Sequence, residues 1–320
     1  MFKIFFTCFW QTDILFLLKK NTPNNSSIWK NIEGTNDINI CDYIVILDDL
    51  DKSLLQKGEK YFKTIIKNYD KIIFFQRENS HFVKQRRKSW FVKNILPLVK
   101  KKYRYEDKFL YTFTPANFLN MSYDELKKLS YKQKQKNISC IVSSKNIHKN
   151  YQKRMDFIKI YSNKYPNSIE IFGKGWNKSM LGNNFKGELG NYHRHDTNKT
   201  LSKFNGLYPY TYSICLENFP NDYIVSEKIT DALLSWCMPI YWGSKYTSEY
   251  FPEDAFHLID LDDPNVYEKV YKISQTPITE KNITAIKQAR GIILDKLNIW
   301  EQIYQITNNY DTFLKKYKYD

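Results

Sequence analysis

The sequence predicts an α/β protein built from two parallel-sheet domains. The chain has 320 residues, of which 42% are hydrophobic and 17% aromatic, and a single hydrophobic core stops growing at about 250–300 residues. A strand, a helix and a second strand are predicted within residues 41–80, which is one βαβ unit and implies a parallel sheet. The same pattern starts again beyond a polar stretch that ends at residue 139, so two domains are expected.

The first half begins with an apolar strand. Residues 1–10, MFKIFFTCFW, are followed by a polar triplet at 11–13, so they are too short to span a bilayer, and they lack a small-residue cleavage site. CDYIVILDDL (41–50) predicts a buried strand, residues 52–68 predict a helix by their apolar spacing, and KIIFFQRENS (71–80) predicts another strand. No later segment has 18 uninterrupted apolar residues, so we expect a cytoplasmic protein, either soluble or peripheral to a membrane.

The second half repeats the alternation of strands and helices. The polar, charged stretch at 127–139 is the predicted linker, and the elements expected after it are strands within 140–144, 168–176, 212–218 and 238–244 and helices over 149–165 and 226–236. Neither half contains G-x-G-x-x-G or G-x-x-x-x-G-K-[ST], which disfavours an NAD enzyme or a P-loop NTPase. The expected division is 1–130 for the first domain, 131–300 for the second, and 301–320 for a basic aromatic helix or tail.

The charge balance favours an anionic partner. Lys and Arg number 49 and Asp and Glu 34, which gives 49 − 34 = +15. Such an excess fits nucleic acid, an anionic membrane surface or a phosphate-bearing substrate. Basic and aromatic residues gather in 82–109, which has two interpretations: a solvated helical face broken near Pro97, or a surface for anionic lipid or an acidic acceptor. Nothing there resembles a known nucleic-acid motif, so no nucleic-acid partner is expected.

Neither a metal site nor a disulfide framework is predicted. The five cysteines are widely spaced and form no C-x-x-C pair, which is typical of small core residues in a reducing compartment. The acidic clusters at 47–51 and 260–263 could pass for a metal-binding D-x-D, but we interpret them as strand ends or turn caps. His193 and His195 lack the partners of a metal site; we interpret them as loop residues, with a phosphate contact as the alternative.

The most informative stretch is 215–244, where a strand, a polar turn and a helix follow one another. Apolar residues recur at i, i+3, i+4 and i+7 from Ile229 to Trp236, so a helix is predicted with Ser226 as its N-cap. Lys228 then lies in the first turn, where the positive end of the helix dipole disfavours a cation. A bound anion at that end, such as a diphosphate, would account for it.

Three polar residues accompany this lysine. Glu217, Asn218 and Glu227 would supply acceptors and donors for sugar hydroxyls. In open α/β sheets ligands bind beyond the carboxyl ends of the strands, and this turn follows such a strand end. A solvated turn is the competing interpretation.

The same stretch resembles the donor-binding motif of the glycosyltransferase family 10 fucosyltransferases. LENFPNDYIVSEKITDALLSWCMPIYWGS, followed by FPEDAFHLIDLDD, is similar to the family pattern of F-E-N, a short turn with Tyr, T-E-K, a helix and a P-[IV]-Y/V-W/x-G stretch. Leu216 replaces the usual Phe, Ser226 replaces Thr, and Tyr223 lies one residue further from the Glu than is usual. The resemblance implies a GT-B fold, in which two Rossmann-like domains face each other across a cleft, the acceptor domain first and the donor domain second.

The resemblance also implies an activity. It implies an inverting alpha-1,3 (or 1,3/1,4) fucosyltransferase that moves fucose from GDP-fucose to an N-acetylglucosamine or glucose unit of a glycan acceptor. KIIFFQRENS resembles the family's strand end that carries the catalytic base, here Glu78, and KNYQKRMDF resembles the segment with the diphosphate-binding arginine. The implied donor-binding residues are Arg154, Asn218, Tyr223, Glu227 and Lys228.

No cofactor is expected. Arg154 and Lys228 would offset the charge that grows as GDP leaves, so a divalent metal ion would not be essential. Two alternatives stay open: a related transferase that uses another GDP-sugar, and a basic nucleic-acid-binding module that uses the segment 82–108.

Overall fold

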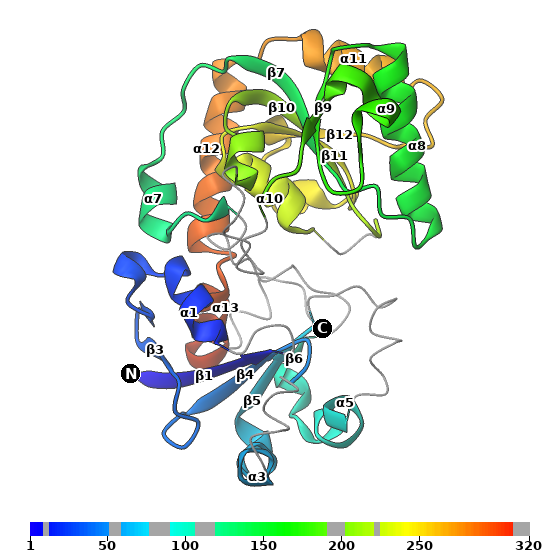
Figure 1. Cartoon of the computed structure of the whole chain (residues 1–320). Coiled ribbons are helices and arrows are strands. Elements are labelled where there is room, and N and C mark those ends of the chain that lie inside the picture. Colours follow the sequence, from blue (N-terminus) through cyan, green and yellow to red (C-terminus); the bar gives the residue numbers. More distant parts are fainter. Residues whose placement is uncertain are drawn as a thin grey trace. The chain divides into compact units, whose positions relative to one another are not determined.

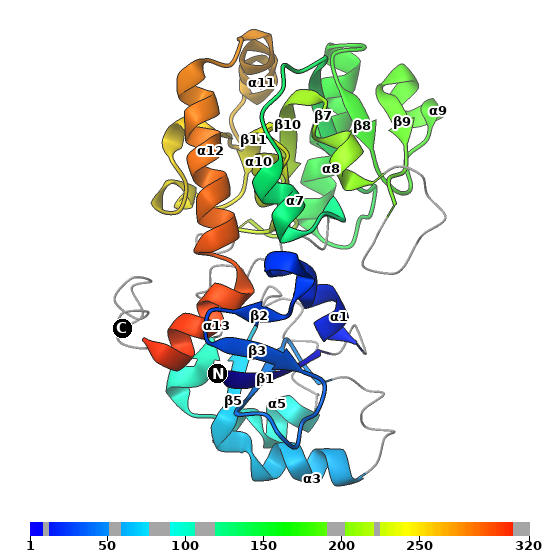
Figure 2. The ribbon, with the colours of Figure 1, turned by 90° about the vertical axis from the view of Figure 1, so that its left-hand side faces the viewer.

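The computed structural model describes residues 1–8, 13–50, 59–76, 90–105, 119–190, 202–220 and 225–309. Within these residues the chain divides into two compact α/β units, each built on a six-stranded sheet (Figures 1 and 2). The first unit comprises the described residues of 1–116, 122–124 and 296–320, and the second those of 117–121 and 125–295. The two parallel sheets expected from the sequence are therefore present.

The sheet of the first unit is parallel except at one edge. Among the described strands β2 pairs antiparallel with β3, and the other neighbours pair parallel. In the order β2-β3-β1-β4-β5-β6, the strands are Ile28–Trp29, Ile32–Thr35, Phe2–Cys8, Tyr43–Leu47, Ile72–Phe75 and Arg104–Tyr105. The strands predicted within 1–10, 41–50 and 71–80 are confirmed.

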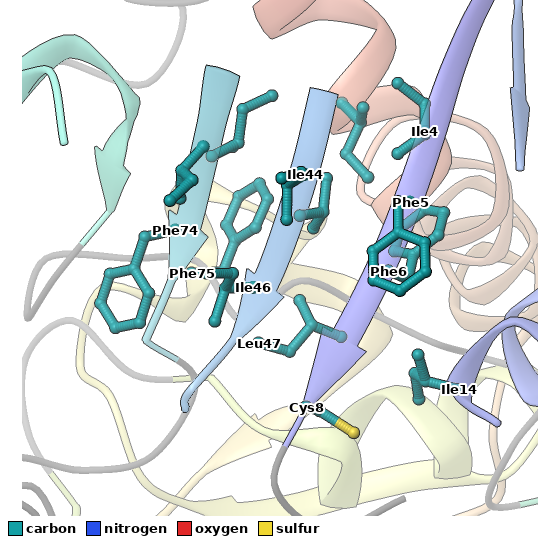
Figure 3. Close-up of a cluster of buried hydrophobic side chains, with 14 of the residues drawn as sticks. Ile4, Phe5, Phe6, Cys8, Ile14, Ile44, Ile46, Leu47, Phe74 and Phe75 are labelled. Carbon is teal, nitrogen blue, oxygen red and sulfur yellow. The ribbon is translucent and has the colours of Figure 1, made fainter. Parts of the chain in front are cut away.

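Helices cover both faces of this sheet. α1 (Ile14–Leu18) and α13 (Ile299–Asn308) lie on one side, and α3 (Glu59–Lys67) and α5 (Trp90–Asn94) on the other (Figures 1 and 2). A parallel strand that is covered on both faces has to be apolar along its whole length. Side chains from β1, β4 and β5 accordingly form a continuous buried cluster (Figure 3).

The terminal helix belongs to the first unit. The indole N–H of Trp300 donates to the carbonyl of Leu18 at 2.9 Å, and its ring lies edge-on to that of Phe6 at 5.0 Å. Apolar residues of α13 spaced at helical intervals are fully buried there, which explains why the helix packs in this core. The structure therefore ends the second unit at residue 295 rather than 300, and places the described part of the predicted tail in the first core.

The sheet of the second unit is parallel throughout its described strands. Its order β9-β8-β7-β10-β11-β12 is the 3-2-1-4-5-6 order of a Rossmann sheet. In sequence order, the strands β7 to β12 are Lys136–Ile141, Glu170–Phe172, Phe185–Gly187, Tyr210–Leu216, Met238–Trp242 and His257–Leu258. The predicted linker 127–139 is corrected in part, because β7 begins at Lys136. Ile138 is buried opposite Tyr212 and Ser139 is buried as well, while Lys136 and Asn137 are exposed.

Helices sandwich the second sheet as well. α8 (Lys149–Lys164), α9 (Lys178–Leu181) and α11 (Val266–Gln275) share one face, and Phe157 of α8 stacks on Tyr267 of α11 at 5.4 Å. α10 (Glu227–Leu234) and α12 (Glu280–Asp295) pack together, and α7 (Tyr123–Lys128) precedes the first strand.

The basic segment predicted at 82–109 is described from residue 90 to 105. It contains the short helix α5, a one-turn helix at 96–98 that includes Pro97, and strand β6. Phe91 and Ile95 are buried, whereas Lys93 is exposed. The break predicted near Pro97 is confirmed in this part. The choice between a solvated face and a surface for anionic lipid or an acidic acceptor stays a prediction.

All five cysteines are free and buried, as expected of small core residues. In the described part of the chain, no helix is long and apolar enough to cross a membrane.

Candidate functional site

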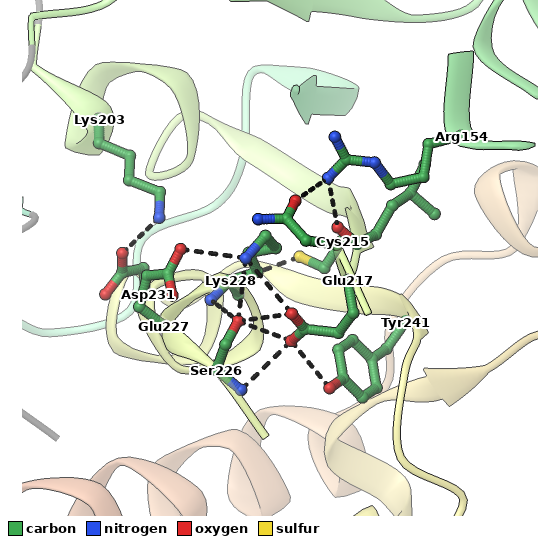
Figure 4. Close-up of polar contacts among 11 residues, drawn as sticks. Arg154, Lys203, Cys215, Glu217, Ser226, Glu227, Lys228, Asp231 and Tyr241 are labelled. Atoms are coloured by element: carbon green, nitrogen blue, oxygen red, sulfur yellow. Dashed lines mark hydrogen bonds and ion pairs between the residues drawn. The ribbon is translucent and has the colours of Figure 1, made fainter. Parts of the chain in front are cut away.

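The candidate site lies where the strand order of the second sheet reverses. β7 and β10 are neighbours; the chain proceeds from β7 to one side and from β10 to the other. Loops diverge beyond the carboxyl ends of two such strands, and this is where open α/β sheets bind ligands. Arg154 on α8 and Lys228 on α10 both reach this point (Figure 4). Asn218, which follows β10, accepts a hydrogen bond from Arg154 there.

The local sequence explains the start of α10. Ser226 has extended backbone, with φ −100° and ψ −177°, and its hydroxyl accepts the amide N–H of Lys228 at 3.3 Å. Ile229 and Leu233 are fully buried one turn apart, and they fix this face of the helix against the sheet. The predicted N-cap is confirmed, and it delivers Glu227 and Lys228 to the carboxyl edge of the sheet.

Glu217 is a buried brace at this edge. Its side chain is 5% exposed, and it accepts from the hydroxyl of Ser226 at 2.6 Å and from the hydroxyl of Tyr241 at 2.9 Å (Figure 4). Burial and the neighbouring Glu217 both raise the pKa of Tyr241, so this phenol stays a donor. A buried carboxylate is stable only when it is bonded in this way. Glu217 thus ties the ends of β10 and β11 to the start of α10, rather than offering free oxygens to a sugar.

Lys228 is held by two carboxylates. Its Nζ lies 3.2 Å from Oε1 of Glu227 and 3.3 Å from Oε2 of Glu217, and it donates to the hydroxyl of Ser226 at 3.1 Å. Burial opposes its charge, but Glu217 and Glu227 outweigh burial and raise the pKa of Lys228. Two carboxylates therefore offset the unfavourable position of this cation in the first turn of the helix. The bound anion that the sequence suggests at this end stays a prediction.

Glu227 is ionised at neutral pH. Burial favours its neutral form, but the cations of Lys228 and Lys203 outweigh burial and hold the pKa of Glu227 at about 2. Its side chain is 21% exposed, so part of it faces solvent. Glu227 can therefore accept hydrogen bonds from a ligand as a carboxylate.

Arg154 is the second cation of the site, and it is 3% exposed. Its Nη1 donates to the carbonyl of Leu216 at 3.3 Å and to Oδ1 of Asn218, and its guanidinium lies 4.6 Å from the ring centroid of Tyr151. Its Nε is buried without a hydrogen-bond partner among the described residues. Burial lowers the pKa of Arg154 from its usual high value, yet arginine remains charged in proteins. Arg154 therefore holds an unused N–H donor.

A glycine turn packs closely beside the end of β7. A side chain at Gly173 would collide with the carbonyl of Val142, and Gly175 has φ +85°, where a side chain is strained. The indole N–H of Trp176 donates to the same carbonyl at 2.8 Å. The glycines of FGKGW therefore serve close backbone packing.

A further buried ion pair lies beside the site. Nζ of Lys203 is 2.5 Å from Oδ2 of Asp231, which is 1% exposed (Figure 4). Burial raises the pKa of Asp231 to about 6, against the opposing effect of Lys203. The sequence did not predict this pair. The available signal was that Asp231 lies four residues after Glu227, on the same face of α10.

The structure brings Arg154, Asn218, Glu227 and Lys228 together, as predicted. Two other predicted residues, Tyr223 and Glu78, lie outside the described residues, as do His193 and His195.

The acidic cluster at 260–263 forms a turn. Asp260 accepts the amide of Asp262 at 3.0 Å, and Lys153 pairs with Asp262 at 2.6 Å. The interpretation as turn caps is confirmed for this cluster. In the part of the chain that the structure describes, no group of three or more His, Cys, Asp and Glu side chains is placed to hold a metal ion.

Comparison with known proteins connects this unit to a family. Residues 131–275 match the family model described as glycosyltransferase family 10 (fucosyltransferase), C-terminal. A curated relative, Alpha-(1,3)-fucosyltransferase FucT of Helicobacter pylori, is 35% identical over 91 residues, which are 28% of this chain and 16% of that protein. The match thus spans less than a fifth of the length of this relative.

Two solved glucosyltransferase structures share the fold of this chain, and a fucosyltransferase structure matches it with a lower TM-score. An alpha-glucosyltransferase in complex with UDP and a 13-mer DNA is 12% identical, with a TM-score of 0.53 and coverage of 97% of this chain and 98% of that one. The same type of enzyme with UDP gives 10% identity, a TM-score of 0.50 and coverage of 98% and 100%. A crystal structure of an alpha1,3-fucosyltransferase is 18% identical over 99% of this chain and 91% of its own, with a TM-score of 0.47.

The likeness to the glucosyltransferases concerns the fold, and the chain has the α/β architecture of GT-B glycosyltransferases, with two parallel-strand sheets. The match to the family model covers β7 to α11 and so includes Arg154, Asn218, Glu227 and Lys228. Residues 131–275 of this chain, which hold the candidate site, are therefore similar to the C-terminal domain of glycosyltransferase family 10, the fucosyltransferase family.

Proposed function

We propose that this chain is an inverting fucosyltransferase that moves fucose from GDP-fucose to an N-acetylglucosamine or glucose unit of a glycan, with an alpha-1,3 or 1,3/1,4 linkage. The observation that carries the proposal is the convergence of Arg154, Asn218, Glu227 and Lys228 at the reversal point of a Rossmann sheet, inside the segment that matches the family model. The H. pylori relative is named an alpha-(1,3)-fucosyltransferase, which supports the same sugar and linkage.

In this proposal Arg154 makes the principal contact with the diphosphate. Its described bonds use Nη1, and Nε is unpaired, so the guanidinium has further donors for phosphate oxygens. Burial keeps it in a water-poor surrounding, where a charge-assisted hydrogen bond is stronger than in bulk water. Asn218, which accepts from the same guanidinium, would orient ribose or fucose hydroxyls.

Lys228 has a different role from Arg154, because its ammonium already contacts three acceptors. We propose that it acts mainly through its charge, which is fixed in position before the donor binds. As GDP leaves, negative charge grows on the diphosphate, and a preorganised cation stabilises that charge without reorganisation. Glu227 would accept a hydrogen bond from a hydroxyl of the donor.

The catalytic base is proposed on sequence grounds. Inverting transfer needs one base to take the proton from the acceptor hydroxyl while that oxygen attacks the anomeric carbon from the face opposite GDP. Glu78 follows β5 (Ile72–Phe75) by three residues, so it comes soon after the carboxyl end of a parallel strand. A transferase that uses another GDP-sugar remains the alternative, because the donor contacts proposed here recognise the diphosphate more than the sugar.

A donor screen tests the proposal. The full chain would be incubated with GDP-fucose, GDP-mannose and UDP-sugars, with and without lactose-type acceptors, and release of free nucleotide would be followed. We expect GDP release from GDP-fucose, stimulated by the acceptor. Turnover of GDP-mannose instead would establish the alternative, and release from UDP-sugars only would contradict the assignment of the donor.

A further inference from the structure

A cavity of about 550 Å³ lies in the second unit, away from the donor-site cluster. Its walls come from the end of α7 and the segment that follows it, from α12, and from Trp236. Residues 127–131 precede β7 and Trp236 precedes β11, so the cavity lies at the amino-terminal edge of the sheet. Arg154 and Lys228 lie at the opposite, carboxyl-terminal edge. The cavity is therefore a separate place on the same unit.

The walls of the cavity carry positive charge. Four cationic residues line it, and the lining residues include no carboxylate. One of the four is compensated from outside the lining, because Nζ of Lys127 is 2.7 Å from Oδ2 of Asp295. The remaining cations have no ion pair with a described residue: Lys128, Lys287 and Arg290. Such a surface disfavours cations and attracts an anion with more than one charge.

One wall is rigidly built. The guanidinium of Arg290 stacks 4.5 Å from the ring centroid of Trp236, and both side chains donate to the carbonyl of Leu129, at 3.2 and 2.8 Å. Arg290 is 4% exposed, and its Nη1 has no hydrogen-bond partner among the described residues. Trp236 has φ +56°, an unfavourable backbone for a large side chain, which the surrounding structure must enforce. Arg290 is therefore a cation held in a fixed position by Trp236 and the carbonyl of Leu129, unlike a lysine that moves freely at the surface.

A glycine keeps the cavity open. Gly291 lies inside α12, where glycine destabilises a helix relative to alanine. A Cβ built at this position would meet no atom within 4 Å, so packing does not require the glycine. Because Gly291 is part of the lining, its missing side chain adds free space at the wall.

We propose that this cavity binds a phosphate ester. A phosphate carries about −1.5 to −2 charges at neutral pH and has several strong acceptor oxygens, which matches three cations without acidic partners. Leu129, Leu294 and Tyr131 also line the cavity and give the organic body of the ester an apolar surface. The volume falls within the range of about 300–1,000 Å³ that is usual for small-molecule sites. The ester is either a soluble sugar phosphate or the headgroup of an anionic lipid.

Equilibrium binding to the full chain tests the proposal, with excess GDP present throughout to occupy any nucleotide site. The probes are glucose 6-phosphate with glucose as its neutral match, and vesicles that contain phosphatidic acid, a lipid phosphate monoester, with phosphatidylcholine vesicles as theirs. Lys287→Glu reverses an exposed charge in the lining, and Gly291→Leu fills the open space while improving the helix. Lys272→Glu, on an exposed position of α11, changes the net charge equally and is the control.

We expect one phosphate probe to bind the parent chain, and to bind Lys287→Glu and Gly291→Leu at least about tenfold more weakly, since each loses charge-assisted contacts or space. The control should bind like the parent. Binding of glucose 6-phosphate would identify a soluble ester, and binding of the anionic vesicles alone a lipid headgroup. No binding of either probe, equal binding by Gly291→Leu, or an equal loss in the control would overturn the proposal.

Discussion

Each unit buries a glutamate, and the two differ in what surrounds them. Glu301 of the first unit accepts from the indole of Trp29 at 2.7 Å and pairs with Lys30 at 2.7 Å, so it joins α13 to β2. Glu217 of the second unit is buried to a similar extent, and its partners include Lys228. Lys30 is 48% exposed, whereas Lys228 is 18% exposed and has a second carboxylate beside it.

Burial alone therefore does not distinguish a glutamate of the candidate site from one that only joins two elements. Around Glu301 the exposed lysine leaves the carboxylate as a structural link between two elements. Glu217, in contrast, lies at the reversal point of the sheet, where it fixes a cation, and it is close to Arg154, which has a donor to spare. A site that binds a ligand needs charged groups that are held in place but still have free hydrogen-bond donors or acceptors, at an edge of the sheet where a ligand can bind.

The largest expected effect is on turnover, and it tests whether the first unit supplies the catalytic base while the second binds the donor. Glu78→Gln keeps the shape of the side chain but removes the proposed base, so turnover should fall by about 10²–10⁴-fold. Calorimetry with GDP should give nearly the parental affinity, because the proposed donor contacts all belong to the second unit. Glu33→Gln, at a glutamate on β3 of the first unit, is the control. If Glu78→Gln keeps more than about a tenth of parental turnover, the base is another residue.

The two buried glutamates can be compared directly. Glu217→Gln and Glu301→Gln each replace a buried carboxyl group that accepts several hydrogen bonds by an amide with one oxygen, so both should lower the free energy of unfolding by about 1–3 kcal/mol, measured by denaturant titration. Only Glu217→Gln should also weaken GDP binding, by about tenfold, because Lys228 loses an ionic partner and Ser226 at the start of α10 loses a charged hydrogen-bond acceptor. Equal GDP affinity in the two variants would remove the proposed distinction between them.

The pair of Lys203 and Asp231 should make the free energy of unfolding depend on pH. The pKa of Asp231 is about 6 in the folded protein against 3.8 for its ordinary value. A raised pKa stabilises the fold fully below about pH 4, and that stabilisation is lost as the pH rises through about 6. Relative to Asp231→Asn, the parent should therefore lose up to about 3 kcal/mol of unfolding free energy between these limits. A difference that stays constant with pH would show that Asp231 does not titrate there.

The smallest expected effect is that of EDTA. If the cations of the second unit neutralise the leaving diphosphate, turnover of GDP-fucose should be unchanged when divalent metal ions are removed. Complete loss of turnover that manganese restores would instead assign a metal to one of the acidic clusters.

Much of the fold could be predicted from local sequence. Apolar runs gave the strands β1, β4, β5, β10 and β11, and helical spacing gave α8 and α10, because burial on one or both faces dictates these patterns. The boundaries were less predictable. β7 starts among polar residues at Lys136. The sequence predicts a separate helix or tail over 301–320 but not its packing in the first core, since the contact of Trp300 with Leu18 joins residues that are distant in the sequence.

The site was predictable only as a set of residues. The motif brought Arg154 and Lys228 into one hypothesis, but it could not show how their charges are balanced. The contact of Glu217 with Tyr241 spans 24 residues, and that of Lys203 with Asp231 spans 28. Such pairs depend on tertiary packing, which no local pattern encodes.

Titration of the chain with GDP in a calorimeter tests the central claim most directly, that the cluster in the second unit holds the nucleotide diphosphate. Arg154→Ala removes the cation with the spare donor, and Lys159→Ala removes a cation from the same helix, α8, outside the cluster. Arg154→Ala should weaken GDP binding by about 1.5–3 kcal/mol, Lys228→Ala should lose less, and Lys159→Ala should bind like the parent. If Arg154→Ala binds GDP as tightly as Lys159→Ala, the cluster is not the diphosphate site.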